Sequence, residues 1–416
     1  MRPPPQLTAL AALFLFFHLA PTATAADAPP WWNRIYEHRL PIRVQANATP
    51  RFNKPVEVAI DLGAESTVNR DSLRLVEIDS DGQVIDDAVP LQFDPAPDAA
   101  HHQPTAVTGT LTFLLQGRTS AQATRRYHLY WRAKGGVPFT APAIAARVSV
   151  TADNVVVAGD VACFKIRTPT ATYLYGKEGG GFAGIIDRDG NDWISYSHVP
   201  RAAGEYHGLP KFGHPEKLFH AGYKGFVSTV TRSGPLCVRI ESEHKDGKSA
   251  CTWNFYPTCA TVTLRKFKLP SYWFLYEGTP GGKLDVEHDA VVRANGKRTP
   301  LSEAWTDNIP WVYFTSGRTD HALFMASHQR HDKVDSYVAW PFEREADGSF
   351  QQMTVFGFGR KGYKELVQHI ADLTDLPATY TIGFIDQLDF DHAAPLIESA
   401  YKPLVTQVAP VEVRPG

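Results

Sequence analysis

Several well-known signatures are missing from this 416-residue sequence, and each absence narrows the range of functions. No Gly-x-Ser-x-Gly segment occurs and no alternation of strands with helices is expected, which argues against an α/β-hydrolase. The sequence has no His-Glu-x-x-His and no Cys-x-x-Cys segment, so zinc hydrolases and redox proteins are not indicated. Long blocks of like charge are also absent and the formal net charge is −2. Nucleic acid is therefore not an expected partner.

Long apolar runs are equally scarce. The one extended run, Leu7–Ala20, follows a basic start at Arg2 and precedes the small residues Ala23-Thr24-Ala25. This pattern predicts a secretory signal peptide over residues 1–25. No later run reaches the roughly 20 apolar residues that a membrane helix needs. We therefore expect a secreted or periplasmic protein with no membrane partner. A monomer is also expected.

Cysteines and metal-ligand patterns are few. Of the four cysteines, Cys237, Cys251 and Cys259 are expected to lie close enough for one disulfide bridge, with buried free thiols as the alternative. Two imidazoles and two carboxylates fall within one short segment, at His328, His331, Asp332 and Asp335. Their spacing favours a solvated turn over a metal site. No cofactor is predicted, and a calcium requirement stays open.

What the sequence does contain is many short strand-like segments, such as Pro55–Leu62 and Leu73–Ile78, with a turn signal every eight to twelve residues. The prediction is an all-β protein with a small N-terminal β-barrel or sandwich, a large β super-sandwich and few short helices. Residues 132–145 are rich in glycine and proline and form the expected linker. The predicted domains are 26–135 and 146–407, and the expected helices are Tyr363–Leu373 and Ala393–Leu404.

Two families share this pattern of strands. The order W-x-R, P-I-R-V, P-V-E-V, L-R-L-V-E-I-D, V-P-L-Q-F-D, G-T-L-T-F-L and R-R-Y-H-L-Y-W resembles the small N-terminal β-barrel of exo-acting rhamnogalacturonan lyases. The run F-K-I-x-T-x-x-A-x-Y, followed by G-G-G-F-x-x-I-I-D-x-D-G-N-D-W-I, resembles the early strands of the galactose-mutarotase-like β super-sandwich. That architecture also forms the body of several polysaccharide lyases. The resemblances imply a secreted enzyme that degrades polysaccharides.

The stretch from Gly204 to Arg293 holds the candidate site. It starts with a loop rich in histidine, tyrosine, glycine and proline, in which His214 is expected only to shape the loop. Its later part joins aromatic residues to Glu277 at a strand end. We predict that these two segments form opposite walls of one cleft. The predicted catalytic residues are Tyr206, His207, His220, Tyr223 and Arg232. The predicted substrate-binding residues are Lys224, Trp273, Tyr276, Glu277, His288 and Arg330.

This set of side chains matches the needs of β-elimination on an acidic polysaccharide or oligosaccharide. A cation must neutralise the uronic carboxylate, for which Lys224, Arg232 or Arg330 are candidates. A base must remove the C5 proton and an acid must protonate the leaving oxygen, and histidine and tyrosine serve both purposes. A polysaccharide lyase is therefore the favoured prediction.

Two alternatives stay open. A glycoside hydrolase would need a pair of carboxyl groups, for which Glu277 and an aspartate such as Asp289 are the candidates. A non-catalytic glycan-binding protein would need exposed aromatic rings but no titrating base. Replacement of His207 and His220 would then leave ligand binding almost unchanged.

Overall fold

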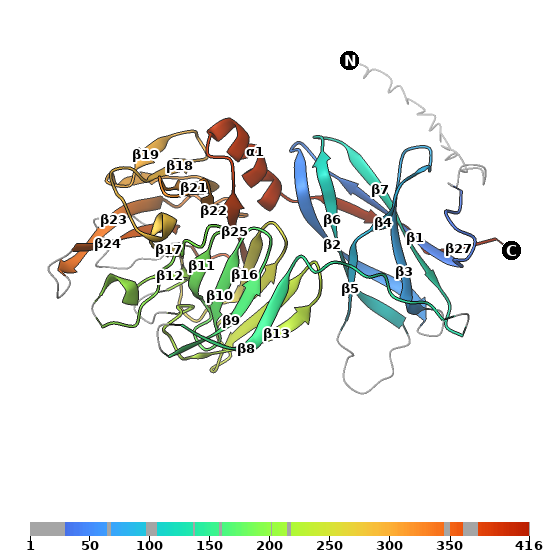
Figure 1. Ribbon diagram of the computed structural model, residues 1–416, viewed down its shortest axis with the longest axis horizontal. Helices are drawn as coiled ribbons and strands as arrows, with labels where there is room; N and C mark the ends of the chain where they lie inside the picture. The colour runs from blue at the N-terminus through green and yellow to red at the C-terminus, as the bar shows by residue number, and fades with distance from the viewer. Residues whose placement is uncertain are drawn as a thin grey trace, which may run out of the picture.

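The computed structural model describes residues 30–64, 68–96, 106–135, 138–157, 160–200, 202–213, 218–344, 350–360 and 373–415. Over these ranges the chain consists almost entirely of antiparallel strands, which confirms the predicted all-β class. Figure 1 shows two β lobes, one built on β1 to β7 and the other on β8 to β25. No helix in the described ranges is long and apolar enough to cross a membrane. The predicted signal peptide lies outside the described residues.

Two sheets pack face to face in the first lobe, with strand orders β26-β1-β7-β3-β4 and β2-β6-β5. Its first seven strands are β1 (His38–Gln45), β2 (Arg51–Ala64), β3 (Asn69–Ile78), β4 (Val84–Val89), β5 (Leu91–Pro95), β6 (Ala106–Thr119) and β7 (Thr124–Arg132). Apolar residues alternate along them, as at Leu111, Phe113 and Leu115, and fill the space between the sheets. Burial of each such side chain contributes about 1.5–3 kcal/mol to folding.

The end of the chain returns to this first lobe. Strands β26 (Val405–Val408) and β27 (Glu412–Val413) both pair with β1. The registers place Ile42 opposite Val408 and His38 opposite Val413. The domain boundary predicted at residue 407 therefore assigns β26 to the second domain, whereas the strand belongs to the sheet of the first lobe.

The second lobe is a sandwich of two nine-stranded sheets. The first sheet has the order β20 (Trp305–Asp307), β23 (Asp335–Arg344), β24 (Phe350–Phe358), β17 (Phe274–Gly278), β12 (Gly208–Lys211), β11 (Phe182–Ile186), β10 (Thr172–Gly176), β9 (Val161–Arg167) and β8 (Ser149–Val157). The second has the order β13 (Phe226–Ser233), β14 (Val238–His244), β15 (Ala250–Phe255), β16 (Ala260–Lys266), β25 (Ala378–Ile385), β22 (Ala322–Ser327), β21 (Trp311–Thr315), β18 (Ala290–Arg293) and β19 (Arg298–Pro300). A large aromatic core, including Phe274 and Tyr276, lies between them. Two short 3-10 turns are also present: η2 (Ala203–Glu205) contacts β24 of the first sheet, and η3 (Pro280–Gly282) contacts β21 of the second.

A single α-helix, α1 (Phe390–Tyr401), is found in the described part of the chain. Asp389 caps its start by accepting a hydrogen bond from the His392 N–H at 3.1 Å. The sequence placed this helix at Ala393–Leu404, and its true end is earlier because β26 starts at Val405. The predicted helix at Tyr363–Leu373 lies outside the described residues except for Leu373.

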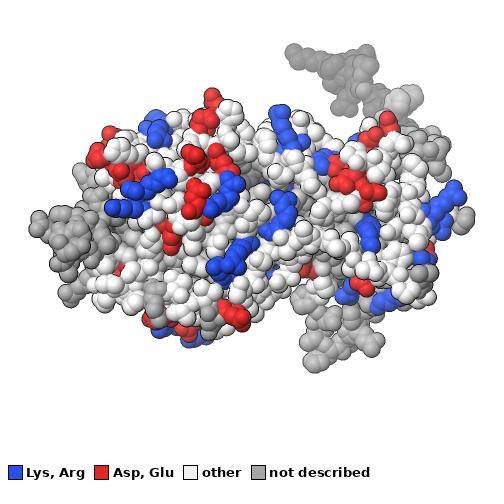
Figure 2. Space-filling model, in the orientation of Figure 1, with Lys and Arg blue, Asp and Glu red and all other residues white. Residues whose placement is uncertain are grey.

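Charged side chains of both signs are mixed on the surface, and the cysteines are buried. On the face shown in Figure 2, basic and acidic side chains are interspersed over both lobes. All four cysteines are buried free thiols. The predicted bridge among Cys237, Cys251 and Cys259 is therefore absent, and the alternative of buried free thiols holds.

Candidate functional site

Pairing of β12 with β17 brings the histidine-rich loop next to the aromatic and acidic segment. Gly208 lies opposite Glu277, and Lys211 lies opposite Leu275. The two segments were predicted to form opposite walls of a cleft, which is wrong, because they are neighbours in one sheet. Along β17, Phe274 and Tyr276 face the core between the sheets. Trp273 and Leu275 contact a separate apolar cluster on the other face of the sheet, and Glu277 shares their side by alternation.

A buried ion pair is at the centre of this outer face. Lys211 Nζ lies 2.6 Å from Glu277 Oε2, and only 3% of the Lys211 side chain and 8% of the Glu277 side chain are exposed. An irregularity in the pairing between Gly208 and Lys211 changes the alternation of β12, so that Leu209 packs in the core while Lys211 meets Glu277. Removal of one partner from such a buried pair leaves an uncompensated charge, at a cost of about 3–5 kcal/mol.

His207 lies beside this pair with one ring nitrogen engaged. Its Nδ1 is 3.0 Å from the Ser195 carbonyl oxygen, which can only accept, so Nδ1 carries the proton. Nε2 is therefore unprotonated in the neutral ring, and it is buried without a hydrogen-bond partner among the described residues. Burial lowers the pKa of His207, and the negative charge of Glu277 partly opposes this effect. The result is a neutral imidazole with an available lone pair.

Arg360, two residues after the end of β24, completes the cluster. Its side chain lies over Gly357, since a Cβ built there would be 2.9 Å from Arg360 Cβ and 3.1 Å from Leu275 Cδ1. Both terminal nitrogens of its guanidinium are buried and lack a hydrogen-bond partner within the described ranges. Burial lowers the pKa of Arg360 to about 10, and Glu277 opposes the shift. Arg360 is thus still a cation at neutral pH, with donors available for an anion.

Apolar and aromatic side chains surround these charges. Trp273, Leu275, Met353 and Val355 form a buried cluster, and Tyr206 packs against it. Lys211 Nζ lies 5.9 Å from the centre of the Tyr206 ring. Such surroundings exclude water and strengthen the electrostatic interactions within the cluster.

His220 lies next to this cluster, but the backbone engages both of its ring nitrogens. Nε2 donates to the Tyr206 carbonyl oxygen at 3.3 Å, and Nδ1 accepts from the Gly222 N–H at 3.2 Å. The ring also makes an edge contact with Tyr196, at 5.7 Å between ring centres. These contacts fit a residue that orders the loop, and do not favour the predicted role as a base.

Tyr223 and Lys224 lie away from the ion pair, around a small pocket that Tyr196 also lines. The Tyr223 hydroxyl is 2.9 Å from His244 Nε2, and His244 Nδ1 is 2.6 Å from Asp246 Oδ1. Lys224 is exposed and reaches Asp160 at 3.8 Å. Both residues had been predicted for the central site, and neither contacts Glu277 or Lys211 through any interaction in the described structure.

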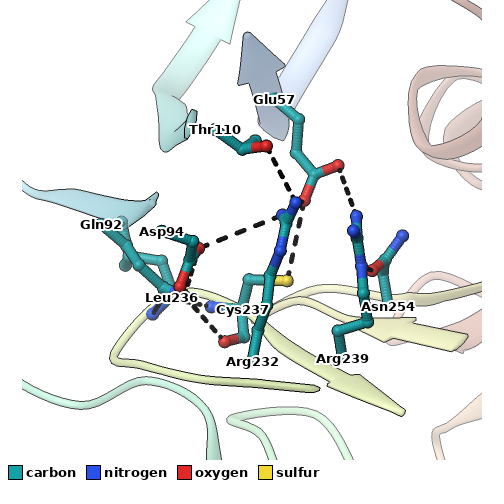
Figure 3. A network of polar contacts seen from close by, with 9 residues as sticks. All are labelled: Glu57, Gln92, Asp94, Thr110, Arg232, Leu236, Cys237, Arg239 and Asn254. Atoms are coloured by element: carbon teal, nitrogen blue, oxygen red, sulfur yellow. Dashed lines mark hydrogen bonds and ion pairs between the residues drawn. The ribbon is translucent and has the colours of Figure 1, made fainter. Parts of the chain in front are cut away.

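Arg232 is found at the junction of the two lobes (Figure 3). From β13 its guanidinium reaches Glu57 of β2 at 3.0 Å and Thr110 of β6 at 2.8 Å. Arg239 binds the other oxygen of Glu57 at 3.4 Å. Gln92 adds three hydrogen bonds to the backbone of Leu236 and Cys237. Arg232 therefore holds the lobes together and does not join the predicted catalytic group.

Three further predicted residues lie elsewhere. Tyr276 is fully buried in the core and donates to the Trp193 carbonyl oxygen at 2.7 Å, so it does not face a substrate. His288 is on the surface, where its Nδ1 is 3.0 Å from Asp285 Oδ2. Arg330 is exposed and close enough to Tyr401 on α1 to act on the pKa of that residue.

Two residues that the sequence suggested less strongly, Asp289 and His328, are not part of the cluster around Glu277 in the described structure. Asp289 accepts hydrogen bonds from the Asp285 and Gly317 N–H groups. It also acts on the pKa of Tyr276, so it lies toward the core side of β17 and not on the side of Glu277. His328 Nε2 is 2.7 Å from Thr381 Oγ1. No group of three or more metal-ligating side chains is found in the described residues. His214 lies outside them.

Two members of the cluster were missed in the sequence. Lys211 is in the predicted loop, but its contact with Glu277 depends on the irregular pairing of β12. Arg360 directly follows a predicted strand and a glycine. The two glycines in the segment before it, Val355-Phe356-Gly357-Phe358-Gly359, were an available signal that another group approaches this strand closely.

Comparisons with known proteins give distant similarities only. No protein-family model matches the sequence, and no curated protein matches it. The crystal structure of HI1317 has 12% identity and a TM-score of 0.38, and the match covers 57% of this chain and 99% of that one. An α-mannosidase from Enterococcus faecalis V583 has 9% identity and a TM-score of 0.46, over 89% of this chain and 46% of that one. This chain thus spans about half of the mannosidase, and at these values neither similarity assigns an activity.

Proposed function

We propose that this protein is a secreted or periplasmic carbohydrate-processing enzyme that cleaves a uronic-acid polysaccharide by β-elimination. The observation that supports this most is the buried Arg360 guanidinium, whose terminal nitrogens lack hydrogen-bond partners in the described residues, together with His207 Nε2, which has an available lone pair. Both residues belong to one charge cluster, because Glu277 acts on the pKa of each. A cation for the carboxylate and a neutral base for the adjacent proton are what the reaction requires. The site is nearly fully buried, so it must open when the saccharide binds.

Arg360 is the group that binds the C6 carboxylate. Its two terminal nitrogens match the two oxygens of a carboxylate, in a bidentate arrangement. Neutralisation of the carboxylate makes the C5 proton more acidic, because negative charge develops on that group as the proton leaves. The low polarity around Trp273 and Leu275 increases this effect.

His207 and Tyr206 carry the proton transfers. His207 Nε2 removes the C5 proton, the C5–H electrons form the C4–C5 double bond, and the bond from C4 to the glycosidic oxygen breaks. The Tyr206 hydroxyl protonates that oxygen as it leaves. A proton then passes from the His207 imidazolium to the Tyr206 phenolate and restores both groups. Glu277 stabilises the imidazolium during this sequence, since its charge favours protonation of His207.

Hydrolysis is less well supported by the same geometry. A glycosidase needs two carboxyl groups about 5–9 Å apart across the scissile bond. Glu277 is bound to Lys211, while Asp289 lies toward the core side of β17 and is held by backbone N–H groups. A glycan-binding protein without activity would have no need of an imidazole with an unengaged buried nitrogen.

The test is the ultraviolet absorbance of the conjugated double bond that elimination creates. The protein is incubated with a panel of uronic-acid polysaccharides, with and without chelator. We expect a rise in absorbance on one substrate class, and a loss of about 10²–10⁴-fold in kcat/KM for His207→Gln. Arg360→Gln should lose activity similarly, whereas exposed His198→Gln serves as the matched control.

Release of reducing ends without new absorbance would contradict elimination and support a glycosidase. If His207→Gln kept full activity on a cleaved substrate, the assignment of the base would be wrong. Activity that disappears with chelator and returns with calcium would add a metal to the reaction.

A further inference from the structure

A second polar cavity lies on the first lobe, on the outer face of the sheet formed by β1 and β7. Its volume is about 490 Å³, within the usual range of 300–1,000 Å³ for ligand sites. Ile42, Val44, Tyr127 and Leu129 point into the core of the lobe, so the alternate residues of the same strands face outward. The charged residues around the cavity are Arg43, Arg126, Asp79, Asp81 and Glu412.

Two arginines are directly opposite each other in this cavity. The pairing of β1 with β7 places Arg43 across from Arg126, and Gln407 of β26 continues the same row. Side chains in such positions have Cβ atoms about 4.5–5.5 Å apart, and like charges there destabilise the sheet. Neither arginine has a carboxylate within ion-pair distance or any other hydrogen-bond partner in the described structure. A repulsive pair of this kind fits a site where an anion binds between the two side chains.

The acidic groups of the cavity are mostly engaged with other partners. Asp79 accepts hydrogen bonds from the Asp81 and Gln83 N–H groups at 2.9 and 2.8 Å. Glu412 is 2.6 Å from the buried Arg39. His128, also in the lining, is neutral at ordinary pH because burial lowers its pKa to about 4. Asp81 is left as the carboxylate at the rim that can accept from hydroxyl groups, while Arg43 and Arg126 supply positive charge without an ion-pair partner in the described residues.

We propose that this cavity binds a uronic-acid segment of the same polysaccharide, as a second, non-catalytic site. Arg43 and Arg126 bind the sugar carboxylate, and Asp81 accepts from its hydroxyl groups. A ligand that combines one carboxylate with several hydroxyls matches this mixture of cations and acceptors. The choice of ligand rests on the function proposed above. Two sites on one chain would raise the affinity for long polymers over short ones.

Binding of galacturonic acid trimer, measured by calorimetry with the His207→Gln protein to prevent turnover, tests the proposal. Substitution of both arginines, R43Q with R126Q, should weaken binding at one of two sites by at least about tenfold, because hydrogen bonds to charged groups contribute 1.5–3 kcal/mol. Arg118→Gln, at an exposed arginine of the same lobe, should bind normally. The neutral trimer maltotriose should not occupy the site. Because R43Q with R126Q removes a repulsion, the melting temperature should not fall, which separates lost binding from lost folding.

Equal binding of the trimer to the double variant and to Arg118→Gln would overturn the proposal, as would equal binding of maltotriose. The two proposals fail separately. If no polymer shows elimination but the double variant loses trimer binding, the second site stands and the lyase does not. If elimination occurs and the double variant binds the trimer unchanged, the lyase stands and the second site does not.

Discussion

At the scale of single residues, the charges around His207 determine its protonation. Burial lowers its pKa, so the imidazole stays neutral to a pH below the ordinary value of about 6.5. Glu277 opposes this shift and Lys211 adds to it. The pH at which His207 becomes protonated therefore depends on these neighbours.

We expect the acidic limb of kcat/KM to have its midpoint below pH 6.5, and Glu277→Gln to move that midpoint still lower. The direction follows because removal of the negative charge disfavours the imidazolium, and the unpaired Lys211 disfavours it further. Profiles of kcat/KM against pH for the two proteins provide the measurement. Glu243→Gln, at an exposed ion pair with Lys266, is the matched control and should leave the midpoint unchanged. A midpoint that rises in Glu277→Gln would contradict the proposed arrangement.

Sequence alone placed some members of this cluster in the candidate site. The mixture of histidine and tyrosine in one loop pointed to His207 and Tyr206, and the position of Glu277 at the end of an aromatic strand was also predicted. Lys211 and Arg360 could not be found in this way, because a lysine or arginine in a loop is usually solvated. Arg232 was misassigned for the related reason that its acidic partner Glu57 is distant in the sequence.

At the scale of elements, Gly357 of β24 has no side chain. Its position leaves room for Arg360, which follows the strand. Gly357 is opposite both Leu275 of β17 and Ser336 of β23, so it is in the middle of the sheet. Glycine is unfavourable in a strand interior, where it has no side chain to pack, and its presence is explained by the close approach of Arg360.

We expect Gly357→Ala to displace Arg360 and to lower kcat/KM by about 10–100-fold, since small errors in position are costly in catalysis. The new Cβ would be 2.9 Å from Arg360 Cβ, which is closer than real contacts allow. Gly317→Ala, where a Cβ has nothing within 4 Å, is the control. Steady-state kinetics, with circular dichroism to verify the fold, make the measurement. Unchanged kinetics in a folded Gly357→Ala protein would mean that Arg360 is not needed at this position.

The strands predicted at Pro55–Leu62 and Leu73–Ile78 lie within β2 and β3, because alternation of apolar side chains is a local property. The pairing between β12 and β17 was not predicted. The distance along the chain between β12 and β17 contains four strands of the other sheet, and no local pattern shows that Gly208 and Glu277 meet. The two-walled cleft that was predicted is an error of this kind.

At the scale of the whole molecule, the polar network around Glu57 joins the lobes through charged groups that are only partly exposed (Figure 3). None of its contacts in the described residues involves His207, Lys211, Glu277 or Arg360. Arg232 links three strands of the first lobe to β13, directly or at the 4.0 Å contact with Asp94.

We expect Arg232→Met to lower the free energy of unfolding by about 1–3 kcal/mol, the cost of leaving Glu57 and Thr110 without this donor. Values of kcat/KM at a temperature where the protein remains folded should not change. Urea denaturation and steady-state kinetics measure the two effects. Arg265→Met, at an exposed pair with Glu241, should cost less than about 1 kcal/mol. A large loss of activity without loss of stability would return Arg232 to the catalytic group.

The return of β26 and β27 to β1 also fixes the order in which the lobes can be completed during synthesis. The strands of the second lobe have all left the ribosome once residue 385 has emerged, whereas the sheet of the first lobe still lacks two strands that come near the end of the chain. Until then β1 presents an unpaired edge, which is able to pair with a strand from another chain. The sheet of the first lobe is therefore completed after those of the second lobe, when Val405–Val408 and Glu412–Val413 cover the edge of β1.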